Sequence, residues 1–181
     1  MDLLYPLTDF YEELHSPAPQ VSRIEAIDVP EPYGRLLVHE RDMTPTLEAA
    51  HQGKLHLRVL HYAVRDDVVK RLVALVMDDE TPVEMGAIKI YLDRLPAAAR
   101  ELVLERRQPF GSILQTQGVV HSSRPAGYFS VQADSLIGDA LGEAEGATLY
   151  GRRNTLCDQD GGILAEVVEI LPLSQKLGDR T

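Results

Sequence analysis

Three stretches in the middle of the chain alternate apolar and polar side chains or are almost wholly apolar, a pattern that predicts β-strands. They cover residues 55–64, 68–77 and 83–92, with a polar turn at residues 78–82. Short connections of this kind join antiparallel neighbours, so we expect the three strands to form a meander. A weaker strand is predicted at residues 128–133.

Helical spacing of apolar side chains predicts helices in other parts of the chain. These cover residues 7–15, 93–106, 109–115 and 135–141. A further helix is expected to start after Asp42, with Thr44 as its cap and Pro45 at its first helical position, and to end at Gly53. Before it, the proline-containing residues 16–32 predict an extended arm, and residues 34–40 predict a short strand.

Near its C-terminal end the chain predicts a β-hairpin. Residues 148–157 and 163–171 flank Asp160-Gly161-Gly162, whose glycines supply the backbone freedom that a tight turn needs. In the second strand, a period of two places Glu169 on the same face as Val167 and Leu171. If that face points inward, the carboxylate loses its water, which is costly unless a partner binds it. Glu169 is therefore either a paired core residue or a group kept for chemistry.

A second charge lies on the apolar phase of a predicted strand. Arg71 alternates with Val73 and Leu75, so we expect Arg71 and Glu169 on the same inward face of one antiparallel sheet. Two interpretations remain open. The two residues form a structural ion pair, or they clamp a ligand, with the arginine on a carboxylate and the glutamate on a hydroxyl at the other end.

Strands at both ends of the pattern with helices inserted between them indicate an α+β fold, in which helices cover one face of an antiparallel sheet. We expect residues 1–40 to form an N-terminal arm that packs on the domain. The domain itself covers residues 41–173, and a polar tail covers residues 174–181.

Composition and charge exclude several classes of function. The formal net charge of −10 disfavours nucleic acid and anionic membrane surfaces as partners. The single Cys157 excludes an internal disulfide and is typical of a reducing cytosol. Neither a signal peptide nor a run of about 20 apolar residues is found, so we expect a cytoplasmic protein. The histidines lack metal-ligand spacing and no phosphate-binding loop is found, so neither a metal nor a cofactor is predicted.

The order and spacing of four motifs resemble chorismate pyruvate-lyase and its chorismate-lyase-like relatives. The motifs are Asp42-Met43-Thr44, Arg71-Leu72-Val73-Ala74-Leu75, Pro109-Phe110-Gly111 and the hairpin from Tyr150-Gly151-Arg152-Arg153 to Glu169. The resemblance extends from about Asp42 to Pro172. In the hairpin, the carboxylate follows Gly162 at the same interval as in the family.

The resemblance implies a pocket on a six-stranded antiparallel sheet, closed by two helical flaps. It also implies a cofactor-independent carbon–oxygen lyase that splits chorismate into 4-hydroxybenzoate and pyruvate. Arg71 and Glu169 would be the catalytic pair, with Arg71 on the ring carboxylate and Glu169 on the oxygen at the opposite end of the ring. The residues expected to bind substrate are Met43, Phe110, Gly111 and Lys89.

The chain departs from the family at two of these positions. Phe110 stands where the best-known lyase has leucine, which would reshape the lid of the pocket. On the strand after the polar turn, Gly86-Ala87 replaces a Gly-Arg pair of that lyase, and Lys89 is the nearest cation.

Two other functions remain open. The same architecture resembles the effector domains of certain transcriptional regulators, which would make the chain a non-catalytic domain that binds an aromatic acid. The residues before Asp42 are too few and not basic enough for the DNA-binding module that normally precedes such domains, so the lyase is preferred. The second alternative is a degenerate relative that binds an aromatic acid without turnover. In each case the expected partner is a small molecule, and the expected assembly is a monomer or weak dimer.

Overall fold

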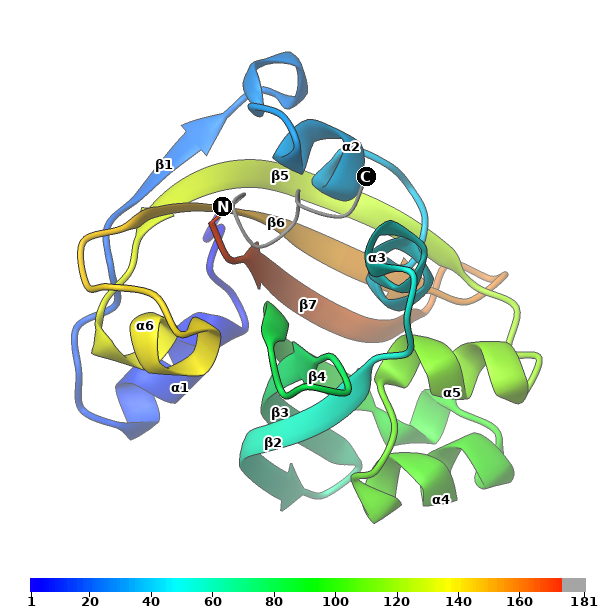
Figure 1. The fold of residues 1–181 in the computed structure, drawn as a ribbon. Helices are drawn as coiled ribbons and strands as arrows, with labels where there is room; N and C mark the ends of the chain where they lie inside the picture. The colour runs from blue at the N-terminus through cyan, green and yellow to red at the C-terminus, as the bar shows by residue number, and fades with distance from the viewer. Residues whose placement is uncertain (174–181) are drawn as a thin grey trace.

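The computed structural model describes residues 1–173, in which one seven-stranded antiparallel sheet carries all the other elements (Figure 1). The spatial order of the strands is β1-β5-β6-β7-β4-β3-β2. The strands are β1 (Val21–Ile24), β2 (His56–Arg65), β3 (Val68–Val76), β4 (Pro82–Tyr91), β5 (Ser122–Gln132), β6 (Thr148–Cys157) and β7 (Ile163–Leu171). The predicted α+β class and antiparallel sheet are confirmed, with one strand more than expected.

Two units that are each local in sequence meet at the centre of the sheet. The predicted meander is β2-β3-β4, and the predicted hairpin is β6-β7, with Gly161 in the left-handed region at its turn (φ 83°). β7 pairs with β4, so Gly86 lies opposite Glu169. On its other side, β7 places Glu169 opposite Arg152 of β6. This junction brings charges from distant parts of the chain onto neighbouring strands.

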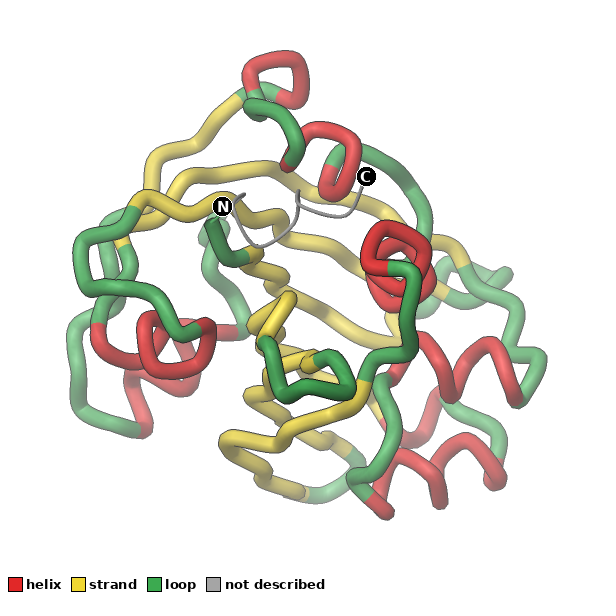
Figure 2. Tube along the Cα trace, in the orientation of Figure 1, coloured by secondary structure: helices red, strands yellow, loops and turns green. Residues whose placement is uncertain are grey.

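Six helices and two short 3-10 helices cover both faces of the sheet (Figure 2). They are α1 (Leu7–Glu13), η1 (Ala26–Asp28), α2 (Tyr33–Leu37), α3 (Met43–His51), η2 (Leu92–Arg94), α4 (Ala97–Glu105), α5 (Phe110–Thr116) and α6 (Ser135–Leu141). α2 and α3 pack against Leu75 and Leu171 on one face, and α4 and α5 pack against Ile88 and Val167 on the same face.

The opposite face is covered by α1 and α6, which differs from the expected cover on one face alone. Phe10 of α1 and Ile137 of α6 share a buried cluster with Leu72, Met85 and Val168 of the sheet. These three strand residues alternate along their strands with the residues of the first face, so their side chains point to the opposite face. Because they are apolar too, both faces of the central strands need a cover that removes them from water.

The segment before α3 differs most from the sequence-based expectation. The predicted strand over residues 34–40 is wrong: Tyr33–Leu37 is helix α2, which buries Tyr33, Leu36 and Leu37 at helical spacing. The extended arm contains the short strand β1, which pairs with β5. α3 begins at Met43 rather than at Pro45, with Asp42 in the N-cap position.

Residues 1–40 contact the rest of the chain on both faces. Leu4 and Leu7 are buried in the cluster under α1 and α6, and the hydroxyl of Tyr33 donates to the carbonyl of Pro172 (2.8 Å). The boundary at residue 40 stays a prediction, and the predicted tail 174–181 lies outside the described residues. Within residues 1–173, none of the helices has both the length and the apolar character needed to cross a membrane.

Candidate functional site

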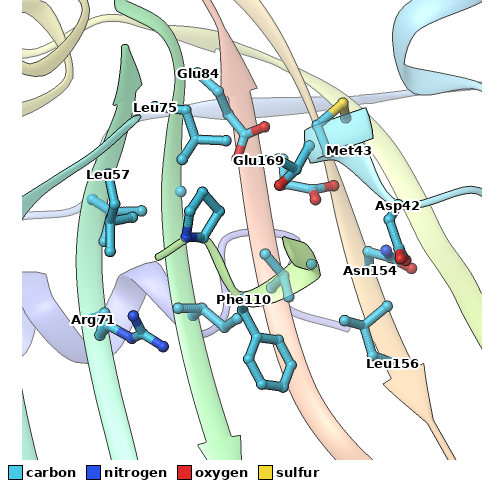
Figure 3. A pocket seen from close by; sticks show the side chains of 17 residues that line it. Asp42, Met43, Leu57, Arg71, Leu75, Glu84, Phe110, Asn154, Leu156 and Glu169 are labelled. Carbon is cyan, nitrogen blue, oxygen red and sulfur yellow. The ribbon is translucent and has the colours of Figure 1, made fainter. Parts of the chain in front are cut away.

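A cavity lies on the face of the sheet that α3 and α5 cover (Figure 3). The volume open to the centre of a water molecule is about 60 Å³. By the same measure one buried water needs ~10–15 Å³, so the cavity is several times larger. Its apolar lining consists of Met43, Leu57, Val73, Leu75, Gly86, Ile88, Pro109, Phe110, Gly111, Leu156 and Val167. Its polar lining consists of Asp42, Thr44, Arg71, Glu84, Asn154 and Glu169. A few polar groups in an apolar pocket are typical of a small-molecule site.

Arg71 is buried in this cavity without a charged partner. The side chain is 1% exposed, and within residues 1–173 its Nε and Nη2 have no hydrogen-bond partner. Its Nη1 makes a long hydrogen bond to the carbonyl of Gln108 (3.4 Å). Burial lowers the pKa of Arg71 to about 10, with the nearby Tyr62 acting in the opposite direction. The guanidinium therefore stays charged at neutral pH, and its free donors are available to an anion.

Glu169 lines the same cavity but already has a partner. The Nε of Arg152 donates to its Oε2, and both side chains are buried. Arg152 also donates to the carbonyls of Leu37 (3.1 Å), His39 (2.9 Å) and Arg41 (3.2 Å). Arg71 and Glu169 thus share a cavity, as alternation predicts, but the ion pair of Glu169 is with Arg152.

Glu84 is a second buried carboxyl in the cavity, and the sequence analysis overlooked it. It is 4% exposed, and its Oε2 has no hydrogen-bond partner within residues 1–173. Burial raises the pKa of Glu84 well above its usual range, the charge of Glu169 raises it further, and Arg152 lowers it. The side chain alternates with Gly86 and Ile88, so the rule that identified Glu169 also identifies Glu84.

The two helices over the cavity are joined at their edge by a charged pair. Asp42, directly before α3, accepts from His121 Nε2 (2.8 Å to Oδ2), while His121 Nδ1 lies 2.8 Å from the carbonyl of Val119. Both ring nitrogens face acceptors, and the protonated imidazole can donate to both of them. The hydrogen bond to Asp42 raises the pKa of His121, against the opposing effect of burial. Asp42 stands out in the sequence only as the start of a helix and of a motif, and its pairing with His121 could not be predicted because the two residues lie 79 positions apart.

The flap residues that the resemblance implies, Met43, Phe110 and Gly111, all line the cavity. Gly111 permits close contact between the two helices, because a Cβ there would lie 3.3 Å from the Oγ1 of Thr44. Their roles toward a ligand stay predictions.

Lys89 requires a correction, because it lies on the opposite face of the sheet. Its Nζ donates to the hydroxyl of Tyr5 (2.6 Å) and lies over the rings of Tyr5 and Tyr91. It follows Ile88, which lines the cavity, so alternation turns Lys89 away from it. Lys89 is therefore not a ligand of this site. No group of three or more His, Cys, Asp or Glu side chains within the described part of the chain is placed to hold a metal ion.

Comparison by sequence identifies no family. No protein-family model matches the chain, and no curated protein matches it.

Comparison by structure gives many matches among solved proteins. PhnF from Mycobacterium smegmatis superposes with a TM-score of 0.59 at 13% identity, over 81% of this chain and 68% of that one. The effector domain of the same PhnF gives 0.56 at 13% identity, over 77% and 90%. A domain from Bordetella bronchiseptica, assigned as the ligand-binding part of a GntR-family transcriptional regulator, gives 0.50 at 14% identity, over 65% and 85%.

At these identities the likeness shows the fold. The chain has the fold of the ligand-binding effector domains of GntR-family regulators. None of the three structures is described as a lyase. Two of these neighbours are described as an effector domain and a ligand-binding domain, which agrees better with the alternative expectation than with the lyase.

Proposed function

We propose that this chain is a small-molecule-binding domain whose cavity takes a small organic acid, with Arg71 as the ligand of the acid's carboxylate. The observation that carries this proposal is the buried guanidinium of Arg71 in the cavity, two of whose nitrogens have no partner within residues 1–173. A charge without a partner is costly to bury, and a bound carboxylate removes that cost through two parallel hydrogen bonds. The apolar wall around Arg71 suits an unsaturated or aromatic ring.

The test is to measure binding of benzoate, 4-hydroxybenzoate and chorismate by calorimetry, with an Arg71→Met variant. Methionine keeps most of the volume and removes the charge, so affinity should fall by roughly 10- to 100-fold, the value of a charge-assisted hydrogen bond. The unliganded variant should also be more stable than the wild type, because the buried unpaired charge is gone.

Arg58→Met is the matched control. Arg58 lies on β2 of the same sheet, but its side chain is 38% exposed and pairs with Glu80. This variant should bind the acids as the wild type does. If no carboxylate binds, or if Arg71→Met retains full affinity, the proposal is wrong.

A second candidate function is the lyase reaction on chorismate or a near relative. The observation that favours it is the presence of Arg71, Glu84 and Glu169 in one cavity. Aromatisation drives this elimination: the ring carbon loses a proton, the ether C–O bond breaks, and the departing enolpyruvate takes up a proton to become pyruvate. The protein then has to orient the substrate and assist proton transfer, for which a buried carboxyl such as Glu84 or Glu169 is suited. Release of pyruvate from chorismate distinguishes this function from binding alone.

A further inference from the structure

The carboxyl groups of Glu84 and Glu169 lie together at the end of the cavity away from Arg71 (Figure 3). Arg152 interacts electrostatically with both. Arg71 lies opposite Ile88 on β4, whereas Glu84 lies opposite Leu75, four positions farther along β3. At about 3.3 Å per residue, these two attachment points are roughly 13 Å apart along the sheet. The cavity therefore has a cationic end at Arg71 and a carboxyl-rich end at Glu84 and Glu169.

At the carboxyl-rich end, the carboxyl groups have only some of the hydrogen-bond partners that their burial requires. Arg152 donates to Glu169, and it also contacts His39 and backbone carbonyls of residues 37–41. Glu84 Oε2 is a buried acceptor without a partner within residues 1–173. Buried acceptors normally have a donor, and one left without a donor is a place where a ligand can supply it.

The backbone leaves room for this carboxyl in the cavity. A Cβ at position 86 would lie 3.2 Å from the Oε1 of Glu84 and 3.3 Å from Val73, so the glycine lets the carboxyl extend over the strand. Glu84 and Glu169 are diagonal neighbours on the same face, because Glu169 lies opposite Gly86.

We infer that the acid bound at Arg71 carries an amino group at its far end, and that Glu84 accepts a hydrogen bond from this amino group. An amino group donates two hydrogens and can serve two neighbouring carboxyls, whereas a hydroxyl donates one. This inference rests on the proposed function and adds the residue that selects the ligand. A site built to accept a hydrogen bond rejects an isostere without the donor, since its own buried acceptor is then left unpaired.

The test compares 4-aminobenzoate, 4-hydroxybenzoate and 4-methylbenzoate, three acids of nearly equal size with two, one and no donor hydrogens at the far end. Calorimetry on the wild type should give affinities that fall in that order, with at least about a tenfold difference between amino and methyl. Glu84→Leu should reduce this preference to within about threefold or reverse it. Glu166→Gln, which changes a carboxylate on the opposite phase of β7, should leave the preference intact.

Stability separates a binding role from a structural one. If Glu84 is retained for a ligand, Glu84→Leu should unfold at a higher temperature than the wild type when no ligand is bound, because a poorly compensated buried carboxyl has been removed. A lower unfolding temperature would assign Glu84 to the packing of the core and would contradict the inference.

The binding outcomes are also distinct from one another. If none of the three acids binds, the proposed function is wrong and this inference falls with it. If all three bind alike, or 4-hydroxybenzoate binds most tightly, or Glu84→Leu keeps the wild-type order, the acid site stands and the inference alone is overturned.

Discussion

At the scale of single residues, the cavity is defined by how its buried charges are compensated. Arg152 and Glu169 compensate each other, and Arg152 fills its remaining donors with backbone carbonyls. Within the described residues, the Arg71 charge has no carboxylate partner, and the Oε2 of Glu84 has no hydrogen-bond partner. Since a buried polar group without a partner lowers stability, these two residues are the ones that a purely structural role does not explain.

Arg152→Ala should lower the free energy of unfolding by about 3–5 kcal/mol, because Glu169 is then a buried carboxylate without a partner. Arg58→Ala is the control, because its side chain on β2 is 38% exposed and pairs with the exposed Glu80. It should cost about 1 kcal/mol or less. Urea unfolding followed by circular dichroism measures both. A double variant, Arg152→Met with Glu169→Leu, should regain much of the stability lost in Arg152→Ala. If Arg152→Ala and its control variant lose similar amounts of stability, the assignment of a buried pair is contradicted.

At the scale of elements, α3 and α5 form the cover of the cavity. They approach closely at Gly111 and Thr44, and Asp42 and His121 connect the start of α3 to the segment that follows α5. The side chains of this pair are 19% and 14% exposed, so solvent screens their interaction only in part. The pair is positioned to hold the start of α3 to the segment after α5 at the edge of the cavity.

The contribution of His121 to stability should depend on pH. Its pKa is raised in the folded protein above the ordinary value of 6.5. Its stabilising contribution is therefore fully present below pH 6.5 and is lost as the pH rises through the folded pKa. The difference in unfolding free energy between wild type and His121→Gln should be larger at about pH 6 than at about pH 9.

Asp42→Asn should remove most of the same pH dependence, because it removes the largest cause of the pKa shift. Guanidinium titrations at both pH values provide the measurement. A wild-type advantage that grows with pH would show that the pair does not act as described.

At the scale of the whole molecule, the N-terminal arm completes the fold on both faces. α1 closes the core on one face together with α6, and α2 lies over the cluster around Leu75 and Leu171 on the other. The arm also supplies the carbonyls of Leu37 and His39 to Arg152, so it supports the cavity from behind. Residues 1–40 and the central sheet are therefore expected to unfold as one cooperative unit.

Leu7→Ala should destabilise the entire protein by about 2–5 kcal/mol, because Leu7 is 1% exposed in the core under α1. Leu14→Ala, at the end of the same helix and 55% exposed, should change stability by less than about 0.5 kcal/mol. Far-ultraviolet circular dichroism and tyrosine fluorescence should report one coincident transition in both variants. Two separate transitions for Leu7→Ala would mean that the arm unfolds independently.

The elements with a strong local pattern were predictable from the sequence. The meander over residues 55–92 and the closing hairpin follow from alternation and turn residues, and Arg71 and Glu169 were both found from their place on an apolar phase. Glu84 was within reach of the same rule and was overlooked. Residues 34–40 were misread because a short apolar run fits a strand and a helix equally well until its packing is known. The resemblance of sequence motifs favoured a lyase, whereas the solved structures that share the fold include a ligand-binding domain and an effector domain.

Alternation along each strand by itself determined which charges lie on an inward phase, because side-chain direction in a strand depends only on local backbone geometry. Which of those charges pair with each other was decided by the tertiary structure. The pairing of β7 with both β4 and β6 sets Arg152 beside Glu169 and brings Glu84 near them, while Arg71 is left with free donors. Partner choice depends on contacts between strands that are distant in sequence, and no local pattern encodes that register.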